Sequence, residues 1–585
     1  MTSVSIPFSL TTKWNEVLQY GPFKHTPPEG KRQGISALLG QTLRLGSVTS
    51  APHAGTFFGW RKTIMREARS QEERNKLNHY TFWPGFVLLL TGIGMGLVYN
   101  EGLVGILART MDWIHVNFGW LEVSLGIIIV MFTVGIALSP IGDIRLGGKD
   151  AKPEFTFWQW FALSLCGCIG IGILFWAMGE PIFHMMQPPL SLHIEPGSKD
   201  AGVFAVAQTT LHWTIAQYCF YTICGVAIAL VSYNRNYPLS VAAGMYAIFP
   251  IKYRPVLTSV IHAICLFSLC CAIATSMGAG LMQIGSGTGI IFDYTPGPVT
   301  WGASAATIIP IYVISSYSGL RKGMRILSTG NTRAFFFLMA LVLFSGPTLF
   351  ILGIGVESFG YFANNFFRNS TLLNTMQIND KWPMQWLVPY MEIFFIFAPL
   401  LGHFLARMGR GRTIRQFILI NVIPPTIFCH FWISIFGGTA VYYQWSGLVD
   451  VWSGIQKFGL ESMVYILFSQ FPFSKILMSI FVIIIIFSFA TMTDSLVSTL
   501  AIISTKGVQA DEEPPRKLKI IWGVVVGLIA YVLCISGGIE PVRGLISLAG
   551  FPMMIFTFAL CISLVKDGVH LLSKPDWLDK ESEIR

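Results

Sequence analysis

Charged residues are scarce in this chain: Asp, Glu, Lys and Arg supply 12% of its 585 residues, whereas hydrophobic residues supply 53%. A soluble protein of this length could not bury so much apolar surface, so the composition excludes a water-soluble globular fold. It predicts an all-α polytopic membrane protein whose partner is the lipid bilayer. The net charge of +10 then reflects loops that face an anionic leaflet, and no nucleic-acid partner is expected.

Motifs of enzymatic chemistry are also missing. The chain has no His-Glu-x-x-His run, no phosphate-binding loop and no serine elbow of the kind that hydrolases use. Its ten cysteines lie inside or beside apolar runs, without metal-ligand spacing and without pairs in loops, which indicates packing residues. We therefore expect neither an enzyme nor a cofactor nor a metal site.

Three regions differ in composition. Residues 1–80 are polar and punctuated by proline and glycine, which predicts a cytoplasmic N-terminal arm without a cleavable signal. Residues 81–566 form the predicted membrane domain. Residues 567–585 are short and of mixed charge, as expected of a cytoplasmic C-terminal tail.

Apolar stretches long enough to cross a bilayer recur through the membrane domain and predict about twelve transmembrane helices. The fifth stretch is long enough for a bent or tilted helix. Their approximate bounds are Phe82–Tyr99, Trp120–Ser139, Phe157–Met178, Val203–Tyr233, Val256–Ile291, Trp301–Tyr317, Ala334–Ile354, Trp386–Ala406, Ile414–Ile435, Ile476–Leu500, Leu518–Ile535 and Val542–Leu564.

Basic residues gather in alternate connections between these stretches. Connections after even-numbered helices contain clusters such as Arg145/Lys149/Lys152, Arg321/Lys322/Arg325/Arg333 and Arg407/Arg410/Arg412/Arg415. The opposite connections, taken as loops, carry few basic residues and include Asn100–Gly119, Glu180–Gly202 and Glu357–Pro383. By the positive-inside rule, both termini are predicted to lie on the cytoplasmic side of the cell inner (plasma) membrane.

A patch almost without side chains interrupts the third apolar stretch. It reads Cys168-Ile169-Gly170-Ile171-Gly172 and is followed by Glu180-Pro181. Glycines destabilise a helix and allow its backbone to unwind, which within a membrane is tolerated only beside a cavity. Interrupted helices of this kind form the binding sites of secondary transporters. Close helix packing through small residues is the alternative interpretation.

Several motifs in order resemble the betaine/carnitine/choline transporter family, over roughly Trp120 to Lys566. They are Gly142-Asp143-Ile144-Arg145-Leu146-Gly147, the Gly-Ile-Gly patch, Met282-Gln283-Ile284-Gly285-Ser286-Gly287, Ser318-Gly319-Leu320-Arg321-Lys322-Gly323, Gly346-Pro347-Thr348, Arg407–Arg415, Ser434–Ala440 and Thr491-Met492-Thr493-Asp494-Ser495. The resemblance implies a leucine-transporter-type inverted 5+5 repeat preceded by two extra helices, alternating access, and commonly a homotrimer.

The family holds its onium solutes in an aromatic box, which this chain matches in part. A quaternary ammonium has no N–H to donate, so aromatic faces hold it by cation–π contact. On the fourth and eighth helices the matching positions give a predicted cage of Trp213, Tyr218, Tyr221, Phe394 and Phe397. Tyr390 shares a helical face with the two Phe residues. Ordinary core packing of these aromatics is the alternative. Backbone amides at Gly170 and Gly172 are expected to face a solute carboxylate.

Glu392 is a second departure from the family's pattern. A carboxylate in a membrane helix is costly and is functional by default, so Glu392 is a candidate for carrying a proton or binding an ion. The helical wheel turns it about 200° from Phe394, away from the cage. A structural carboxyl, protonated or ion-paired, is the alternative. His184, His212, His262, His403 and His430 are possible relay partners, without the spacing of a metal site.

The sodium sites implied by the resemblance are incomplete. Sodium needs oxygen ligands, yet Met492 stands where the second hydroxyl of the tenth helix belongs, and Leu269 and Ile273 stand at the fifth-helix pair. Thr491, Thr493 and Thr332 are the remaining candidate ligands, and Arg333 is a candidate substitute for the ion's charge.

These observations predict a secondary active transporter of a small methylated-onium solute, such as glycine betaine, carnitine, choline or a sulfonium analogue. It is expected to work without strict dependence on sodium. A solute sensor or channel built on the same fold, and a carrier of a different amine or amino-acid-like solute, are the alternatives, since fold alone does not decide between them.

Overall fold

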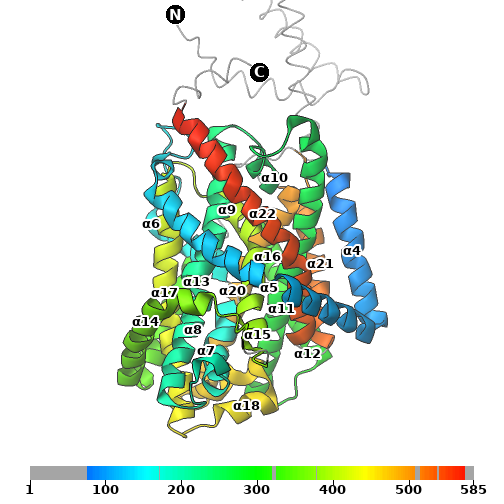
Figure 1. Cartoon of the computed structure of the whole chain (residues 1–585). Coiled ribbons are helices and arrows are strands. Elements are labelled where there is room, and N and C mark those ends of the chain that lie inside the picture. Colours follow the sequence, from blue (N-terminus) through cyan, green and yellow to red (C-terminus); the bar gives the residue numbers. More distant parts are fainter. Residues whose placement is uncertain are drawn as a thin grey trace, which may run out of the picture. The chain divides into compact units, whose positions relative to one another are not determined.

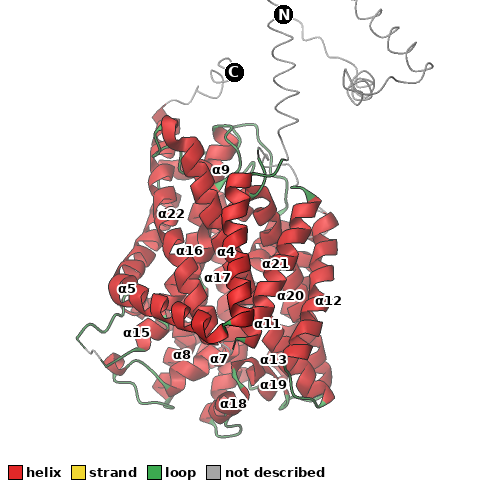
Figure 2. Cartoon of the chain, turned by 90° about the vertical axis from the view of Figure 1, so that its right-hand side faces the viewer, coloured by secondary structure: helices red, strands yellow, loops and turns green. Residues whose placement is uncertain are grey.

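The structure is a computed structural model that describes residues 76–169, 172–318, 325–376, 379–506, 514–536 and 539–573. Nearly all of the predicted N-terminal arm, Gly170, and the last residues of the predicted tail lie outside these ranges. The described chain is almost entirely helical, as Figure 2 shows, and its β pairing is limited to the isolated bridges Leu77–Thr505 and Arg145–Thr413.

The N-terminal half of the described chain consists of helices joined by loops and short 3₁₀ turns. They are α4 (His79–Val98), α5 (Asn100–Leu138), α6 (Phe157–Ile169), α7 (Gly172–Met186), α8 (Lys199–Trp213), α9 (Ile215–Asn234), α10 (Val241–Gly244), α11 (Arg254–Phe292) and α12 (Pro298–Ser318), with the 3₁₀ turns η1 (Pro140–Asp143), η2 (Leu190–Leu192) and η3 (Ile251–Tyr253) between them.

The C-terminal half continues in the same way. Its helices are α13 (Arg325–Ser345), α14 (Thr348–Ser370), α15 (Trp382–Gln385), α16 (Leu387–Ala406), α17 (Ile414–Trp445), α18 (Val451–Phe458), α19 (Met463–Phe468), α20 (Ser474–Ile503), α21 (Arg516–Ile535) and α22 (Ile539–Ser573), with the 3₁₀ turn η5 (Leu460–Ser462).

Length and hydropathy identify the membrane-crossing helices among the described residues. Ten segments are long and apolar enough to cross a bilayer, and the pair α6–α7, bent by 63°, makes an eleventh. The remaining predicted stretch, Trp301–Tyr317, is the helix α12. Within the described residues, each of the twelve predicted apolar stretches is therefore largely helical, and this part of the chain has the all-α architecture of a multi-pass membrane protein.

Three segments predicted as loops are helical instead, which corrects the sequence-based boundaries. Asn100–Gly119 is the first half of α5, Glu180 lies inside α7, and α14 covers 357–370 of the predicted loop Glu357–Pro383. The predicted helix Ala334–Ile354 is divided at Gly346-Pro347, where proline removes a backbone donor, so α13 ends at Ser345 and begins earlier, at Arg325. Arg333 consequently lies in a helix and not in a loop.

Two of the family-like motifs meet at one end of the bundle. Leu146 N donates to Arg412 O at 2.9 Å, Ile414 N donates to Ile144 O at 3.0 Å, and Arg415 pairs with Asp143. Gly411 adopts φ of +82°, and a Cβ there would lie 2.2 Å from a backbone carbon of Lys152. Only glycine fits that position without distortion.

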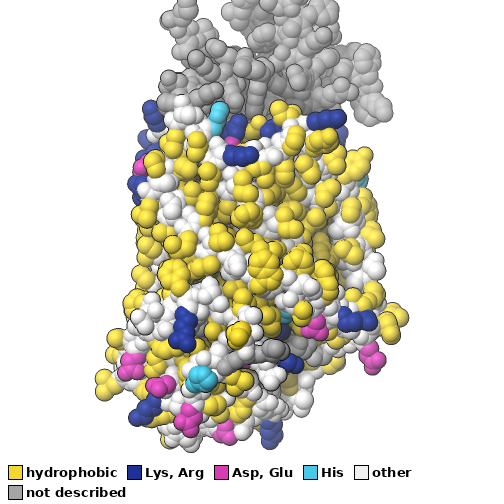
Figure 3. All heavy atoms as spheres, viewed as in Figure 1, with side chains coloured by type: hydrophobic (Ala, Val, Ile, Leu, Met, Phe, Trp, Pro, Cys, Tyr) yellow, Lys and Arg dark blue, Asp and Glu magenta, His cyan; other side chains and the backbone are white. Residues whose placement is uncertain are grey.

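The surface of the bundle matches a bilayer environment. Apolar side chains cover the middle of the face shown in Figure 3, and Lys and Arg side chains gather along its upper edge, where α22 ends in Figure 1. The lower edge of that face carries residues of both signs. A band of apolar surface between polar edges is the arrangement that a lipid-embedded protein requires.

Helix α16 lies at the centre of the bundle and positions the site described next. It packs against α9, α22 and α5, and the segment Trp382–Ala406 is almost wholly buried. The helices α5 and α22, in turn, lie side by side in Figure 1 and pack on each other. A central helix surrounded in this way can present one face to a cavity and its other faces to neighbouring helices.

Candidate functional site

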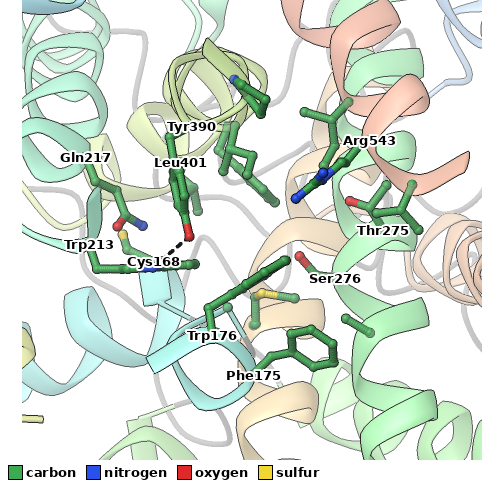
Figure 4. Close-up of a pocket in the computed structure, with 18 of the residues that line it drawn as sticks. Cys168, Phe175, Trp176, Trp213, Gln217, Thr275, Ser276, Tyr390, Leu401 and Arg543 are labelled. Carbon is green, nitrogen blue, oxygen red and sulfur yellow. Dashed lines mark hydrogen bonds between the residues drawn. The ribbon is translucent and has the colours of Figure 1, made fainter. Parts of the chain in front are cut away.

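A cavity opens between α16 and the break of the α6–α7 pair. Its volume is about 110 Å³, and because about 10–15 Å³ on this measure holds one water, the space admits a small solute. Figure 4 shows Trp213 and Tyr390 on one side of it, Trp176 near its middle and Arg543 on the opposite side. We call this cavity the central pocket.

Aromatic side chains provide most of the wall of the central pocket. Three of the five predicted cage residues line it, namely Trp213, Tyr221 and Phe397, together with Gly172. Sequence reasoning missed three further aromatic residues, Phe175, Trp176 and Trp386, and it placed a fourth, Tyr390, on the cage face of the helix without including it in the cage. The rings of Trp176 and Trp386 are nearly perpendicular, with their centroids 5.9 Å apart. The pocket is thus more aromatic than the eighth-helix sequence alone predicts.

Two predicted cage residues do not line the central pocket. Tyr218 is buried, with its hydroxyl 3.5 Å from Cys429 Sγ. Phe394 is buried against Phe220, with ring centroids 5.4 Å apart. The α16 residues that line the pocket include Tyr390, Ile393 and Phe397. The structure thus brings Trp213, Tyr221 and Phe397 together at the pocket, whereas Phe394 lies beside the row of α16 side chains that lines it.

The position of Trp213 results from two local features. It is the last residue of α8, and Thr214 departs from helical geometry with φ of −122° and ψ of −119° before α9 begins. A Cβ on Gly172 would lie 2.6 Å from two atoms of the Trp213 ring. The ring can approach α7 this closely only because residue 172 lacks a side chain.

A single buried carboxylate holds the polar edges of these rings. Glu180 of α7 accepts hydrogen bonds at Oε2 from Trp213 Nε1 at 2.7 Å and from the hydroxyl of Tyr390. Its Oε1 lies 2.6 Å from His212 Nδ1 and 3.1 Å from His184 Nε2. Every one of these residues is buried. A buried charge is tolerated when it is fully hydrogen-bonded, as Glu180 is here.

The ligand atoms of Glu180, His184 and His212 lie within 4.8 Å of one another, a closeness that the sequence spacing did not predict. Direct hydrogen bonding of Glu180 to the two histidines explains this closeness. A tetrahedral zinc ion with bonds of about 2.0–2.1 Å keeps its ligand atoms more than about 3 Å apart, whereas Glu180 and His212 approach to 2.6 Å. The group is a hydrogen-bonded network in this arrangement, and it has no room for an ion between those two atoms.

Arg543 of α22 brings a positive charge to the other side of the central pocket. It lines the pocket, is half-buried, and its guanidinium carbon lies 5.7 Å from the centre of the Trp386 ring. Ser276 and Thr275 of α11 line the wall near it in Figure 4. A guanidinium presents planar donors suited to a carboxylate, and contact with an aromatic face stabilises it.

Glu392 lies outside the central pocket, as its helical position predicts. It is buried and accepts a hydrogen bond from Ser547 Oγ at 2.6 Å, and His115 Nε2 lies 3.1 Å from the same oxygen. These two partners belong to α22 and α5. The partner histidine, His115, was not among the residues that sequence reasoning considered.

The remaining candidate ion ligands lie on α13 and α20. Thr332 is buried and donates to Ser328 O at 2.8 Å, and its hydroxyl lies 3.2 Å from Cys166 Sγ. Thr491 donates to carbonyls of its own helix, and Thr493 is buried without a partner for its hydroxyl. Arg333 is exposed, unlike its neighbour Thr332. Gly170 lies outside the described residues.

Residues 80–570 match the sequence profile of the betaine/carnitine/choline family transporters, and this chain belongs to that family. It is therefore a transporter and not an enzyme. It is 29% identical over 474 residues to a probable glycine betaine transporter of Desulfitobacterium hafniense, which covers 80% of this chain and 93% of that protein.

Other relatives carry different names. A high-affinity choline transport protein of Escherichia coli is 28% identical over 529 residues, which are 89% of this chain and 76% of that protein. An ectoine/hydroxyectoine transporter of Virgibacillus pantothenticus is 28% identical over 497 residues, 84% of this chain and 97% of that protein. Relatives of similar identity are thus named for different solutes.

The sequence held usable signals for some of the missed residues. Glu180 was visible in the Glu180-Pro181 pair after the glycine patch, but it fell in the segment Glu180–Gly202, which was predicted as a loop. Arg543 stands at the start of the last apolar stretch, where a charge within a membrane helix is a marker of function. Trp386 lay at the predicted start of the eighth helix. Nothing in the sequence marked Trp176 as a pocket residue, apart from its position one turn after the glycine patch.

Proposed function

We propose that this chain is a secondary active transporter, working by alternating access, of a small zwitterion with a methylated onium head, such as glycine betaine, carnitine or a sulfonium analogue. The observation that carries the proposal is the opposite character of the two sides of the central pocket. Trp213 and Tyr390 stand on one side, with the Glu180 carboxylate behind them, and Arg543 stands on the other.

The aromatic side suits an onium group. A methylated cation gains about 0.5–2 kcal/mol from each well-placed aromatic face, and the negative charge of Glu180 behind Trp213 adds a favourable field. Glu180 itself is occupied by protein donors at both oxygens, so it would attract the head without bonding to it. This separation suits a cation that has no N–H to donate.

The Arg543 side suits an anionic group. A carboxylate placed there would accept charge-assisted hydrogen bonds from the guanidinium, whereas choline, which has no anionic group, would meet only a like charge. This narrows the predicted solute class from any methylated onium compound to zwitterions. The relatives include a probable glycine betaine transporter and a choline transport protein. The proposal is that this chain differs from the choline transport protein in preferring a zwitterion.

The test is counterflow and net uptake of radiolabelled solutes in proteoliposomes, with glycine betaine, carnitine, a sulfonium analogue and choline as the panel. Saturable counterflow of the zwitterions, with choline the poorest substrate, is expected. Choline transported as well as glycine betaine would overturn the zwitterion preference. Single-channel current without counterflow would overturn the carrier itself and favour a channel.

The same proposal places the chain in the inner membrane with both termini in the cytoplasm. It also includes assembly as a homotrimer. The gathering of Lys and Arg at one edge of the visible face supports this orientation. Cysteine labelling from either side of the membrane, at single cysteines placed in the connections, tests the orientation, and native mass spectrometry in detergent tests the assembly.

A further inference from the structure

A second buried polar cluster lies on the side of α16 that faces away from the central pocket. Its members are Glu392 of α16, His115 and Glu122 of α5, and Ser547 of α22, and each is less than a tenth exposed. Ser547 Oγ and His115 Nε2 both contact Glu392 Oε2, at 2.6 and 3.1 Å, and lie 3.3 Å from each other. We call these four residues the carboxyl cluster.

Glu122 is the unusual member. It is fully buried, and neither of its carboxyl oxygens has a hydrogen-bond partner. It faces α16, because Gly119 and Gly126 on the same side of α5 abut Val388 and Met391 closely enough that a Cβ would lie within 3.2 Å of either. Glu122 and Glu392 interact electrostatically, and the second oxygen of Glu392, Oε1, also lacks a partner.

Two buried carboxylates at this place cannot both carry an uncompensated negative charge. Removing one such anion from water costs several kcal/mol even after relaxation, and two like charges side by side repel in a medium of low dielectric constant. The titratable partner from α5 is His115, and α22 contributes Ser547, with Arg543 one turn earlier beside the pocket. The helix α9 faces this part of α16 with Phe220.

A proton fits the cluster better than a metal cation does. A hard cation needs several converging oxygen atoms, but the space beside Glu392 Oε2 is already filled by the hydroxyl of Ser547 and the ring nitrogen of His115. A proton needs only one carboxyl oxygen, and three carboxyl oxygens of the cluster are free of hydrogen bonds. Intramembrane carboxyl groups of this kind are typical of proton relays.

We propose that Glu122, Glu392 and His115 form a proton-binding site, separate from the solute site, that couples proton movement to solute transport. In each cycle one proton would bind at the cluster, cross with the solute and leave on the other side. The coupling part of this proposal rests on the transport function proposed above. The proton-binding part does not.

The helices α16 and α22 supply the physical link between the two sites. On α16, Ile393 lines the central pocket directly after Glu392, and on α22, Ile546 lines it directly before Ser547. The two helices touch at backbone level, since a Cβ on Gly550 would lie 2.9 Å from Glu392 O. Gain or loss of a proton therefore changes the contact between two helices that also form the pocket wall.

The first experiment needs no solute. Infrared difference spectra of the purified protein, recorded between acidic and alkaline buffer, are expected to contain a carbonyl band of a buried carboxylic acid. The band should disappear in Glu122→Gln or Glu392→Gln and persist in Glu101→Gln, which removes the same charge from an exposed site on α5. A band unchanged in both cluster variants overturns the site, and a band abolished by sodium at constant pH assigns the cluster to a metal cation instead.

The second experiment measures coupling. In proteoliposomes with a pH-sensitive dye inside, adding glycine betaine to wild-type protein is expected to acidify the lumen, and Glu392→Gln should reduce that rate by about tenfold or more, within the usual range of coupling between two sites. Counterflow of the solute, which needs no net proton movement, should stay within about twofold of wild type. Equal acidification in wild type and Glu392→Gln overturns the coupling.

Failure of the two proposals can be told apart. A wild-type protein that shows the infrared band but no counterflow of any solute refutes the proposed function and leaves the proton site standing. Should Glu392→Gln fail to fold, Ser547→Ala serves as the second variant. It removes one hydrogen bond to Glu392 and should shift the pH at which the band appears, and an unshifted band contradicts the cluster.

Discussion

The indole nitrogen of Trp213 donates a hydrogen bond of 2.7 Å to Oε2 of Glu180, which joins a pocket-lining ring of α8 to a buried carboxylate of α7. The same oxygen accepts from the hydroxyl of Tyr390 on α16. The aromatic wall of the central pocket is therefore oriented by a charge that the solute does not need to touch.

Replacing Trp213 tests this wall. Trp213→Leu removes both the cation–π face and the bond to Glu180, and is expected to weaken onium binding by about 0.5–2 kcal/mol. Trp213→Phe keeps a ring and should lose less. Isothermal titration calorimetry with glycine betaine measures both. Phe394→Leu, which changes a buried ring outside the pocket, is the control, and an affinity in Trp213→Leu equal to wild type removes Trp213 from the site.

Gly172→Ala should act on binding through Trp213. The added methyl group would lie 2.6 Å from the ring, so the indole must move away from its bond to Glu180, at a cost of about 1–3 kcal/mol typical of overpacking. We expect a higher KM for counterflow and a changed tryptophan emission spectrum. Gly135→Ala, at a position with open space around it, should behave like wild type. A normal KM in Gly172→Ala would show that the ring position does not matter.

Arg543→Gln should reverse the solute preference. A hydrogen bond to a charged group contributes about 1.5–3 kcal/mol, so glycine betaine is expected to bind about tenfold to a hundredfold more weakly, while choline, freed from a like charge, binds as well or better. Competition binding with both solutes gives the comparison directly. Arg109→Gln, an exposed position on α5, is the control. Parallel losses for both solutes would argue against a contact with the anionic group.

Sodium should be dispensable. Leu269 and Ile273 are fully buried and offer no oxygen, Met492 faces the central pocket with a thioether, and the hydroxyl of Thr491 is bonded within its own helix. Replacing sodium by potassium should change the initial uptake rate less than about tenfold, which corresponds to about 1.4 kcal/mol of coupling. A larger loss would restore a sodium site, with Thr493 the first hydroxyl to examine by substitution with valine.

Hydropathy predicted the membrane helices because lipid requires long apolar segments wherever the chain crosses it. It did not predict their breaks. Thr214 has no glycine or proline beside it, and the interruption there coincides with tertiary bonds, since Trp213 Nε1 donates to Glu180 of α7 and lies 3.0 Å from the hydroxyl of Tyr390 on α16. Such contacts join residues far apart in the sequence, so no local pattern announces them.

The pocket-lining face of α16 shows the limit of helical spacing. The spacings of three and four residues both keep a side chain on one face of a helix, and sequence alone does not distinguish the stripe through Phe394 from the stripe through Ile393. Packing decides, because Phe220 of α9 occupies the surface beside Phe394 and Phe395. Glu392 lies away from the pocket, as its place on the helical wheel predicts. It is about half a turn from Phe394, and that angle is larger than the angle between the two possible lining stripes.

The four bonds at Glu180 also set a limit on how the protein moves. Its donors and partners come from α7, α8 and α16, and breaking any of these contacts would leave a polar group unsatisfied inside the bundle. In the alternating-access cycle proposed above, these three helices are therefore expected to move as one rigid body. The surfaces expected to shift are then the edges of that body, where α16 packs on α22 and where α8 is followed by α9.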